Sequence, residues 1–143
     1  MSFDKLKEYL PYRGEKYIKP EKAGNYRRYM MDLRDLARQA RDEFSLISKS
    51  FEDRVKPFKA ERVSQWMNQS QLCRPHFWCY FRLPSDGLDD SALAIRLYGE
   101  SDNFGISVEV SFVERRRSEN SLEKQNKVLN LLPFGAMYYF VQK

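Results

Sequence analysis

Residues 76–83 read His-Phe-Trp-Cys-Tyr-Phe-Arg-Leu, and here the hydrophobic pattern changes from a helical to an extended period. Every second position carries a polar or amphipathic side chain: His76, Trp78, Tyr80 and Arg82. The intervening positions are apolar. Because successive side chains of a strand point to opposite faces, this alternation is typical of a half-buried β-strand. The stretch therefore separates a helical part of the chain from a sheet.

Two further alternating stretches follow, at 93–98 and 106–112. The connections between the three stretches are rich in glycine, proline and polar residues, which favour tight turns. Neighbouring strands joined by short turns indicate an antiparallel β-meander. We expect a C-terminal helix over 119–131 to follow, and residues 136–141 are candidates for a last strand.

On the N-terminal side, residues 20–55 have the clearest helical pattern. Apolar side chains recur every three or four positions and so form one stripe along a helix. The stripe consists of Tyr26, Tyr29, Met30, Leu33, Leu36, Ala37, Ala40, Phe44, Ile47 and Phe51. A second, shorter helix is predicted over 59–68, with Val63, Trp66 and Met67 turned inward.

The predicted fold class is α+β, with a long and a short helix packed on the antiparallel meander. The chain of 143 residues has the usual size of one domain, and we expect 1–143 to form a single one. Within it we distinguish an irregular arm over 1–19 with a helical turn near 3–9, a helical half over 20–69, and a sheet with its C-terminal helix over 73–143.

The net charge of +5 is unevenly distributed. Residues 1–62 contain 16 basic and 11 acidic residues, whereas residues 63–143 contain 9 of each. The whole positive excess therefore belongs to the helical half. Such an excess aids solubility, and it also attracts nucleic acid or an acidic protein surface.

Several classes of active site are excluded by missing residues. The six glycines form neither a dinucleotide-binding nor a P-loop motif, and no GxSxG motif occurs. Two cysteines, Cys73 and Cys79, and the single histidine cannot complete a tetrahedral metal site. Along one extended strand the two cysteines would lie about 20 Å apart, which is beyond disulfide reach. We expect free thiols, no metal and no cofactor.

No stretch of the sequence approaches the run of about 20 apolar residues that a membrane span requires. Residues 1–12 carry acidic side chains and lack the apolar segment of a signal peptide. Together with the low cysteine content, these features lead us to expect a cytoplasmic protein without a membrane segment.

The polar face of the predicted sheet is the main candidate for a binding site. If the apolar face packs on the long helix, the other face presents aromatic rings and arginines that can stack bases or hold an anion. The candidate binding residues are His76, Trp78, Tyr80, Arg82, Arg96 and Glu109. A purely structural interpretation stays open, in which other parts of the chain cover Trp78 and Tyr80, and Arg96 pairs with Glu109 across strands.

Three functions are compatible with this pattern. The first is a cytosolic binding or accessory module whose sheet face contacts nucleic acid or an acidic protein surface. The second is a small enzyme acting on a phosphorylated or acidic metabolite, with His76 or Glu109 as acid or base. The third is a structural homodimer in which the aromatic face forms the interface.

Residues 73–82, Cys-Arg-Pro-His-Phe-Trp-Cys-Tyr-Phe-Arg, resemble the centre of a small bacterial family of uncharacterised proteins. In that family a Tyr-Arg pair follows the His-Phe-Trp motif, whereas Phe81 here separates Tyr80 from Arg82. The resemblance covers residues 62–132 and includes the Glu-, Arg- and Ser-rich start of a helix. Some members carry a provisional label of glucose-6-phosphate 1-dehydrogenase, which implies NADP binding. Because the glycine fingerprint for that cofactor is missing, we do not transfer the label.

Overall fold

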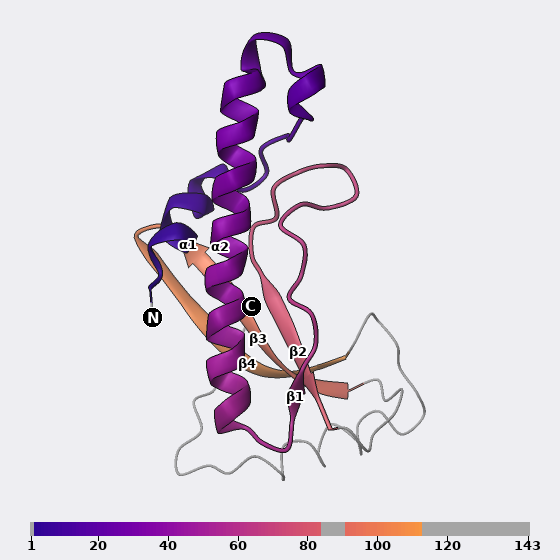
Figure 1. Cartoon of the computed structure of the whole chain (residues 1–143). Helices are drawn as coiled ribbons and strands as arrows, with labels where there is room; N and C mark the ends of the chain where they lie inside the picture. Colours follow the sequence, from indigo (N-terminus) through magenta and orange to yellow (C-terminus); the bar gives the residue numbers. More distant parts are fainter. Residues whose placement is uncertain (1, 84–90, 113–143) are drawn as a thin grey trace.

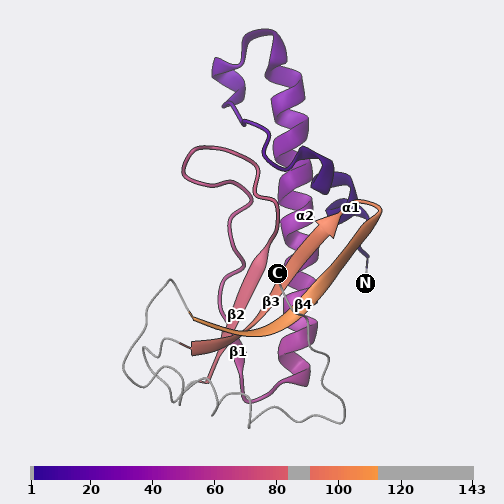
Figure 2. The same ribbon diagram turned by 180° about the vertical axis from the view of Figure 1, so that it is seen from behind.

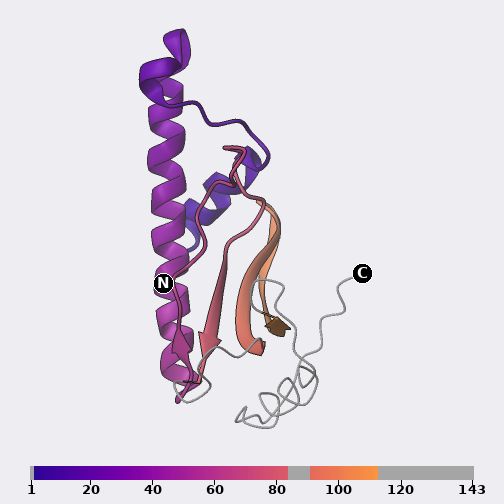
Figure 3. The same ribbon diagram turned by 90° about the vertical axis from the view of Figure 1, so that its right-hand side faces the viewer.

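The computed structural model describes residues 2–83 and 91–112. A long helix, α2 (Arg27–Arg54), lies across a four-stranded antiparallel sheet. Viewed edge-on, the helix and the sheet form two layers (Figure 3). The predicted α+β class, with a long helix packed on an antiparallel sheet, is therefore confirmed.

Helix α2 follows the predicted apolar stripe but begins later than expected. Residues 20–26 form two 3-10 turns, η2 (Pro20–Lys22) and η3 (Gly24–Tyr26), and these lie beyond the end of the sheet (Figure 1). Tyr26 precedes the helix and is 68% exposed, so it does not belong to the core. The stripe from Met30 to Ile47 is buried against the sheet.

The N-terminal segment is more ordered than the predicted irregular arm. Helix α1 (Asp4–Tyr9) and the turn η1 (Leu10–Tyr12) pack on one side of α2, where Leu6 and Leu10 are buried. The backbone then pairs with residues 71–73: Gly14 N–H donates to Cys73 O and Tyr17 N–H donates to Gln71 O, both at 2.8 Å. This pairing ties the N-terminal segment to the chain just before β2.

The predicted helix over 59–68 is wrong. Strand β1 (Lys59–Ala60) pairs with β2, and the chain continues beside β2, where Glu61 N–H donates to Tyr80 O and Ser64 N–H donates to Trp78 O. Arg41 of α2 donates to the carbonyl oxygens of residues 63 and 64, which a helix would use internally. The extended conformation is favoured because its backbone N–H groups donate hydrogen bonds to the carbonyl oxygens at the edge of β2.

The sheet is the predicted meander. Its strands follow in the order β1-β2-β3-β4, with β2 (Trp78–Arg82), β3 (Ser91–Glu100) and β4 (Asn103–Phe112). The β3–β4 hairpin is tighter than the predicted loop over 99–105, since Gly99 already pairs with Phe104 and Glu100 with Asn103.

The core lies between α2 and one face of the sheet. Cys79 and Phe81 of β2 and the alternate residues of β3 from Leu93 to Leu97 are buried there. The ring of Phe51 meets that of Phe81 edge-on at 5.1 Å between centroids, and the rings of Phe44 and Phe77 stack at 5.8 Å. The apolar face therefore packs on the long helix, as the alternation predicted.

Residues 61–75 lie along one side of α2 and α1 lies along the other (Figures 1 and 2). None of the helices in the described part of the chain is long and apolar enough to cross a membrane. Residues 84–90 of the connection between the first two predicted strands, the predicted C-terminal helix over 119–131 and the candidate last strand over 136–141 lie outside the described residues.

Candidate binding surface

The six predicted site residues lie on the sheet face that points away from α2. The strand register places Trp78 of β2 opposite Arg96 of β3, and Arg96 opposite Ser107 of β4. His76 precedes β2, and Glu109 is two residues beyond Ser107. The described side chains of this set are half-buried rather than fully exposed. We call the group of Arg74, His76, Trp78, Arg96 and Glu109 the outer-face cluster.

Arg96 is the centre of the outer-face cluster. Its Nε donates to Glu109 Oε1 at 2.9 Å, and its Nη1 lies 3.2 Å from His76 Nε2. The ion pair is diagonal across the two strands, since Glu109 stands opposite Ala94 in the register. The structural interpretation of Arg96 and Glu109 as a cross-strand pair is thus confirmed.

Trp78 is surrounded by cationic and aromatic groups. The guanidinium carbon of Arg74 lies 4.7 Å from the centre of its ring system, and that of Arg96 lies at 5.7 Å, both within the range of cation–π attraction. The imidazole of His76 lies 5.6 Å away between ring centroids. The indole therefore lies near Arg74 and His76 of its own segment and near Arg96 of β3.

Arg74 was not among the predicted site residues. It lies outside β2, but it shares the alternate-residue spacing of His76 and Trp78, and that spacing is the signal that could have identified it. Its backbone N–H donates to Trp66 O at 2.8 Å and its Nε donates to Met67 O at 3.2 Å. These bonds hold the guanidinium over Trp78.

The charges of the outer-face cluster do not balance. Arg74 forms no ion pair with any described residue, whereas Arg96 has Glu109 as its acidic partner. Burial lowers the pKa of His76, the charges of Arg96 and Arg74 lower it further, and Glu109 opposes this. The imidazole is therefore neutral at pH 7, and the cluster has one positive charge in excess.

Arg82 and Tyr80 stand apart from the outer-face cluster. Arg82 Nε lies 2.8 Å from Glu61 Oε1, so its charge is already paired at the edge of the sheet. Tyr80 lies opposite the buried Ala94. The sequence placed both residues on the correct face but could not show the partner of Arg82, because Glu61 was assigned to a helix.

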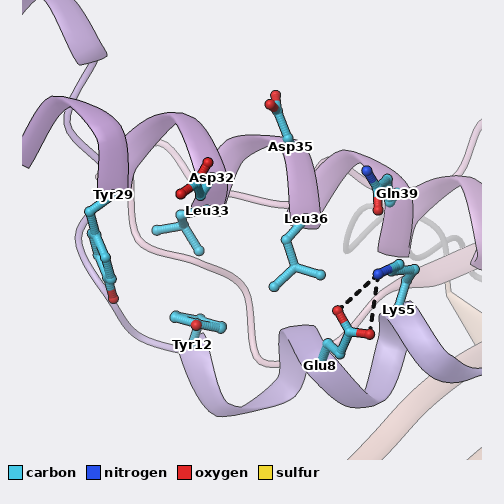
Figure 4. Close-up of a pocket in the computed structure, with 9 residues that line it drawn as sticks. All are labelled: Lys5, Glu8, Tyr12, Tyr29, Asp32, Leu33, Asp35, Leu36 and Gln39. Carbon is cyan, nitrogen blue, oxygen red and sulfur yellow. Dashed lines mark hydrogen bonds and ion pairs between the residues drawn. The ribbon is translucent and has the colours of Figure 1, made fainter.

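Three grooves of the described part of the chain lie elsewhere. Figure 4 shows the one between α1 and α2, in which Leu33 and Leu36 point toward α1 and the Lys5–Glu8 ion pair closes one end. Another separates α2 from residues 60–63, and the last adjoins Phe104. None of the three is lined by a residue of the outer-face cluster.

Neither cysteine belongs to a reactive site. Cys73 and Cys79 are free and buried, and burial is the main cause that raises the pKa of each thiol to about 11. Cys79 lies on the core face of β2, opposite to the face of His76, as the alternation predicted. Within residues 2–83 and 91–112, no group of three or more acidic, histidine or cysteine side chains is arranged to hold a metal ion.

Comparison of the chain with protein-family models, with curated proteins and with solved structures finds no significant match. The resemblance of residues 62–132 to a small bacterial family therefore stays a prediction. The functional argument rests on the geometry of the outer-face cluster.

Proposed function

We propose that this protein is a binding module that contacts single-stranded nucleic acid through the outer-face cluster. The observation that carries this proposal is the placement of Arg74 over Trp78, without an acidic partner among the described residues. A planar guanidinium stacked on an indole offers positive charge and a flat surface in one place. These are the two features that a base and its neighbouring phosphate require.

The neighbours of Trp78 support the same proposal. Arg96 is anchored by Glu109, so it is already oriented before any partner arrives. His76 is uncharged, and because its Nε2 accepts from Arg96 Nη1, its Nδ1–H is the group that can donate to a base edge. A half-buried position also strengthens the attraction between a guanidinium and an anion, because water screens it less.

An enzymatic reaction at this surface has less support. His76 and Glu109 both contact Arg96, which lies between them, and neither residue lines one of the three grooves. An acid–base pair needs a substrate within hydrogen-bond reach of both groups. No observation in the described part of the chain favours that arrangement.

The test is binding of a short, mixed-sequence, fluorescein-labelled single-stranded oligonucleotide, followed by anisotropy across a series of salt concentrations. We expect the affinity to fall steeply between about 50 and 200 mM salt. Trp78→Leu should weaken binding by about 1–3 kcal/mol through loss of stacking, and Trp78→Phe should retain part of it. Arg74→Gln should weaken binding and make the salt dependence shallower.

Arg28→Gln is the matched control for Arg74→Gln, because it removes the same charge from an exposed position on α2 that pairs with Asp32. Equal affinities for the two arginine variants would contradict the proposal, as would a wild-type protein that does not bind. Stronger binding to a poly-glutamate peptide would instead indicate an acidic protein partner. Light-scattering mass of the free protein reports whether the surface forms a homodimer.

A further inference from the structure

One flank of α2 is rich in basic residues, although it also carries Glu52 and Arg34 is paired with Asp35. Basic residues recur at steps that return to nearly the same angle around a helix of 3.6 residues per turn. They are Arg27, Arg34, Arg38, Arg41 and Lys49. Arg41 of this flank contacts the segment that contains residues 63 and 64, whereas α1 packs on the other side of the helix (Figure 1). Much of the positive excess of the helical half is therefore concentrated along one edge of the molecule.

A groove of about 370 Å³ lies where this basic flank meets the segment after β1. From α2 it is lined by Arg41, Ser45, Ser48, Lys49 and Glu52, and from the other side by residues 60–63. Arg41 holds the two walls together, because it donates to Val63 O at 2.8 Å and to Ser64 O at 2.9 Å. The groove is thus built by tertiary contacts and does not depend on a bound ligand.

The acidic and basic side chains of this groove differ in how they are engaged. Glu52 accepts a hydrogen bond from the backbone N–H of Ala60, and Glu61 is paired with Arg82. Lys49 and Arg62, in contrast, form no ion pair with any described residue. The lining carries three cationic side chains, Arg41, Lys49 and Arg62, against the carboxylates of Glu52 and Glu61, and Arg82 compensates Glu61, so the net positive charge of the groove attracts anions.

We infer that this groove binds a backbone phosphate of single-stranded nucleic acid through Lys49 and Arg62. The inference rests on the proposed function and extends its surface around the edge of the sheet. Only the segment of residues 61–64 separates the groove from β2, since Ser64 N–H donates directly to Trp78 O. A nucleic-acid strand whose base stacks on Trp78 therefore has to cross only this one edge segment to bring a neighbouring phosphate to the groove.

The test compares Lys49→Gln, Arg62→Gln and the double variant with the wild-type protein in the oligonucleotide assay. Both residues are exposed, so the substitutions do not disturb the core. We expect each single variant to reduce the slope of log affinity against log salt by about 0.7, the value for one phosphate contact on a single strand. Arg28→Gln, which lies away from this flank, should leave the slope unchanged.

A second measurement separates failure of this inference from failure of the proposed function. NMR spectra of the wild-type protein are recorded with the oligonucleotide and, separately, with inorganic phosphate. Chemical-shift changes at residues 49 and 60–63 with both probes support phosphate binding in the groove, provided that they are absent in the double variant. If the double variant binds the oligonucleotide with the wild-type slope of log affinity against log salt, phosphate binding in the groove is overturned. Binding at the outer-face cluster is unaffected by that outcome. Absence of oligonucleotide binding overturns both.

Discussion

The phenolic oxygen of Tyr9 lies 2.9 Å from the carbonyl oxygen of Arg74, although 65 residues separate the two in the sequence. The same hydroxyl lies 2.9 Å from Trp66 O, and the ring packs against Phe77 at 5.2 Å. Helix α1 thereby holds the segment that places Arg74 over Trp78. A residue of the first helix thus contributes to the position of a member of the outer-face cluster.

Tyr9→Phe should lower the free energy of unfolding by about 1–3 kcal/mol, because Arg74 O loses the donor that Tyr9 supplies, while Trp66 O keeps the N–H of Arg74 and the ring packing is kept. Urea unfolding followed by circular dichroism measures the change. Tyr26→Phe is the control, since that hydroxyl belongs to an exposed side chain in front of α2. Similar stabilities for the two variants would show that the Tyr9 hydroxyl contributes little.

Gly99→Ala should destabilise the β3–β4 hairpin. Gly99 has a φ of +95°, and an added Cβ would lie 2.8 Å from the Cα of Phe104 and collide with the carbonyl oxygen of Asn103. Strain at such a position amounts to about 1–3 kcal/mol, and the backbone clash adds to it. Thermal unfolding should show a lower midpoint for Gly99→Ala than for Gly24→Ala, where φ is +55° but the space around the Cβ is open. Equal decreases in the unfolding midpoint of the two variants would mean that the positive φ causes the loss and that the backbone clash adds nothing.

The titration of His76 should report the electrostatics of the outer-face cluster. It is the only histidine of the chain, so its NMR signals are unambiguous. We expect an apparent pKa below the ordinary 6.5, a higher value in Arg96→Gln and a lower one in Glu109→Gln. An unshifted pKa in all three proteins would contradict the assigned contacts.

The same shift gives a pH dependence of stability. Between the folded pKa and 6.5 the unfolded chain binds more protons than the folded one at this site. Stability should therefore decrease as the pH falls through this window, and His76→Asn should remove that part of the decrease. The comparison requires urea unfolding at several pH values for both proteins. A steeper loss in the variant would contradict the expected sign.

The thiols of Cys73 and Cys79 should resist modification in the folded protein. Both are buried, and a pKa of about 11 leaves almost no thiolate at pH 8. A disulfide reagent should react with both thiols in denaturant and with neither on the same timescale in buffer. Rapid reaction of one thiol in buffer would show that its site opens easily.

The same two thiols give an alkaline pH dependence of stability. Because folding raises the pKa of each thiol from 9.0, the free energy of unfolding should fall as the pH rises from about 9 to 11.

The elements with a strong local period were predictable. The apolar stripe from Met30 to Phe51 forms a helix and packs on the sheet, and the alternation over 76–83 places His76, Trp78 and Arg82 on one face. In both cases the pattern of burial is a direct consequence of side-chain geometry along the backbone. The predicted binding residues of β2, β3 and β4 share a face for this reason.

Elements whose conformation depends on a neighbour were not predictable in the same way. The spacing of Val63, Trp66 and Met67 fits a helical face. The chain forms no helix here, and Val63 and Trp66 are nevertheless buried. The edge of β2 and the guanidinium of Arg41 decide that conformation, and both lie far away in the sequence. The acidic partner of Arg82 was missed for the same reason.

By itself, the sequence determined the fold class, the long helix, the meander and the face on which the polar and aromatic side chains gather, because these follow from local periodicity. Only the tertiary structure decided which charges are left without a partner. Arg82 is neutralised by Glu61, whereas Arg74 lies over Trp78, and Lys49 and Arg62 face a groove whose carboxylates are already engaged. Pairing of charges depends on distances between segments remote in the sequence, and no local pattern encodes those distances.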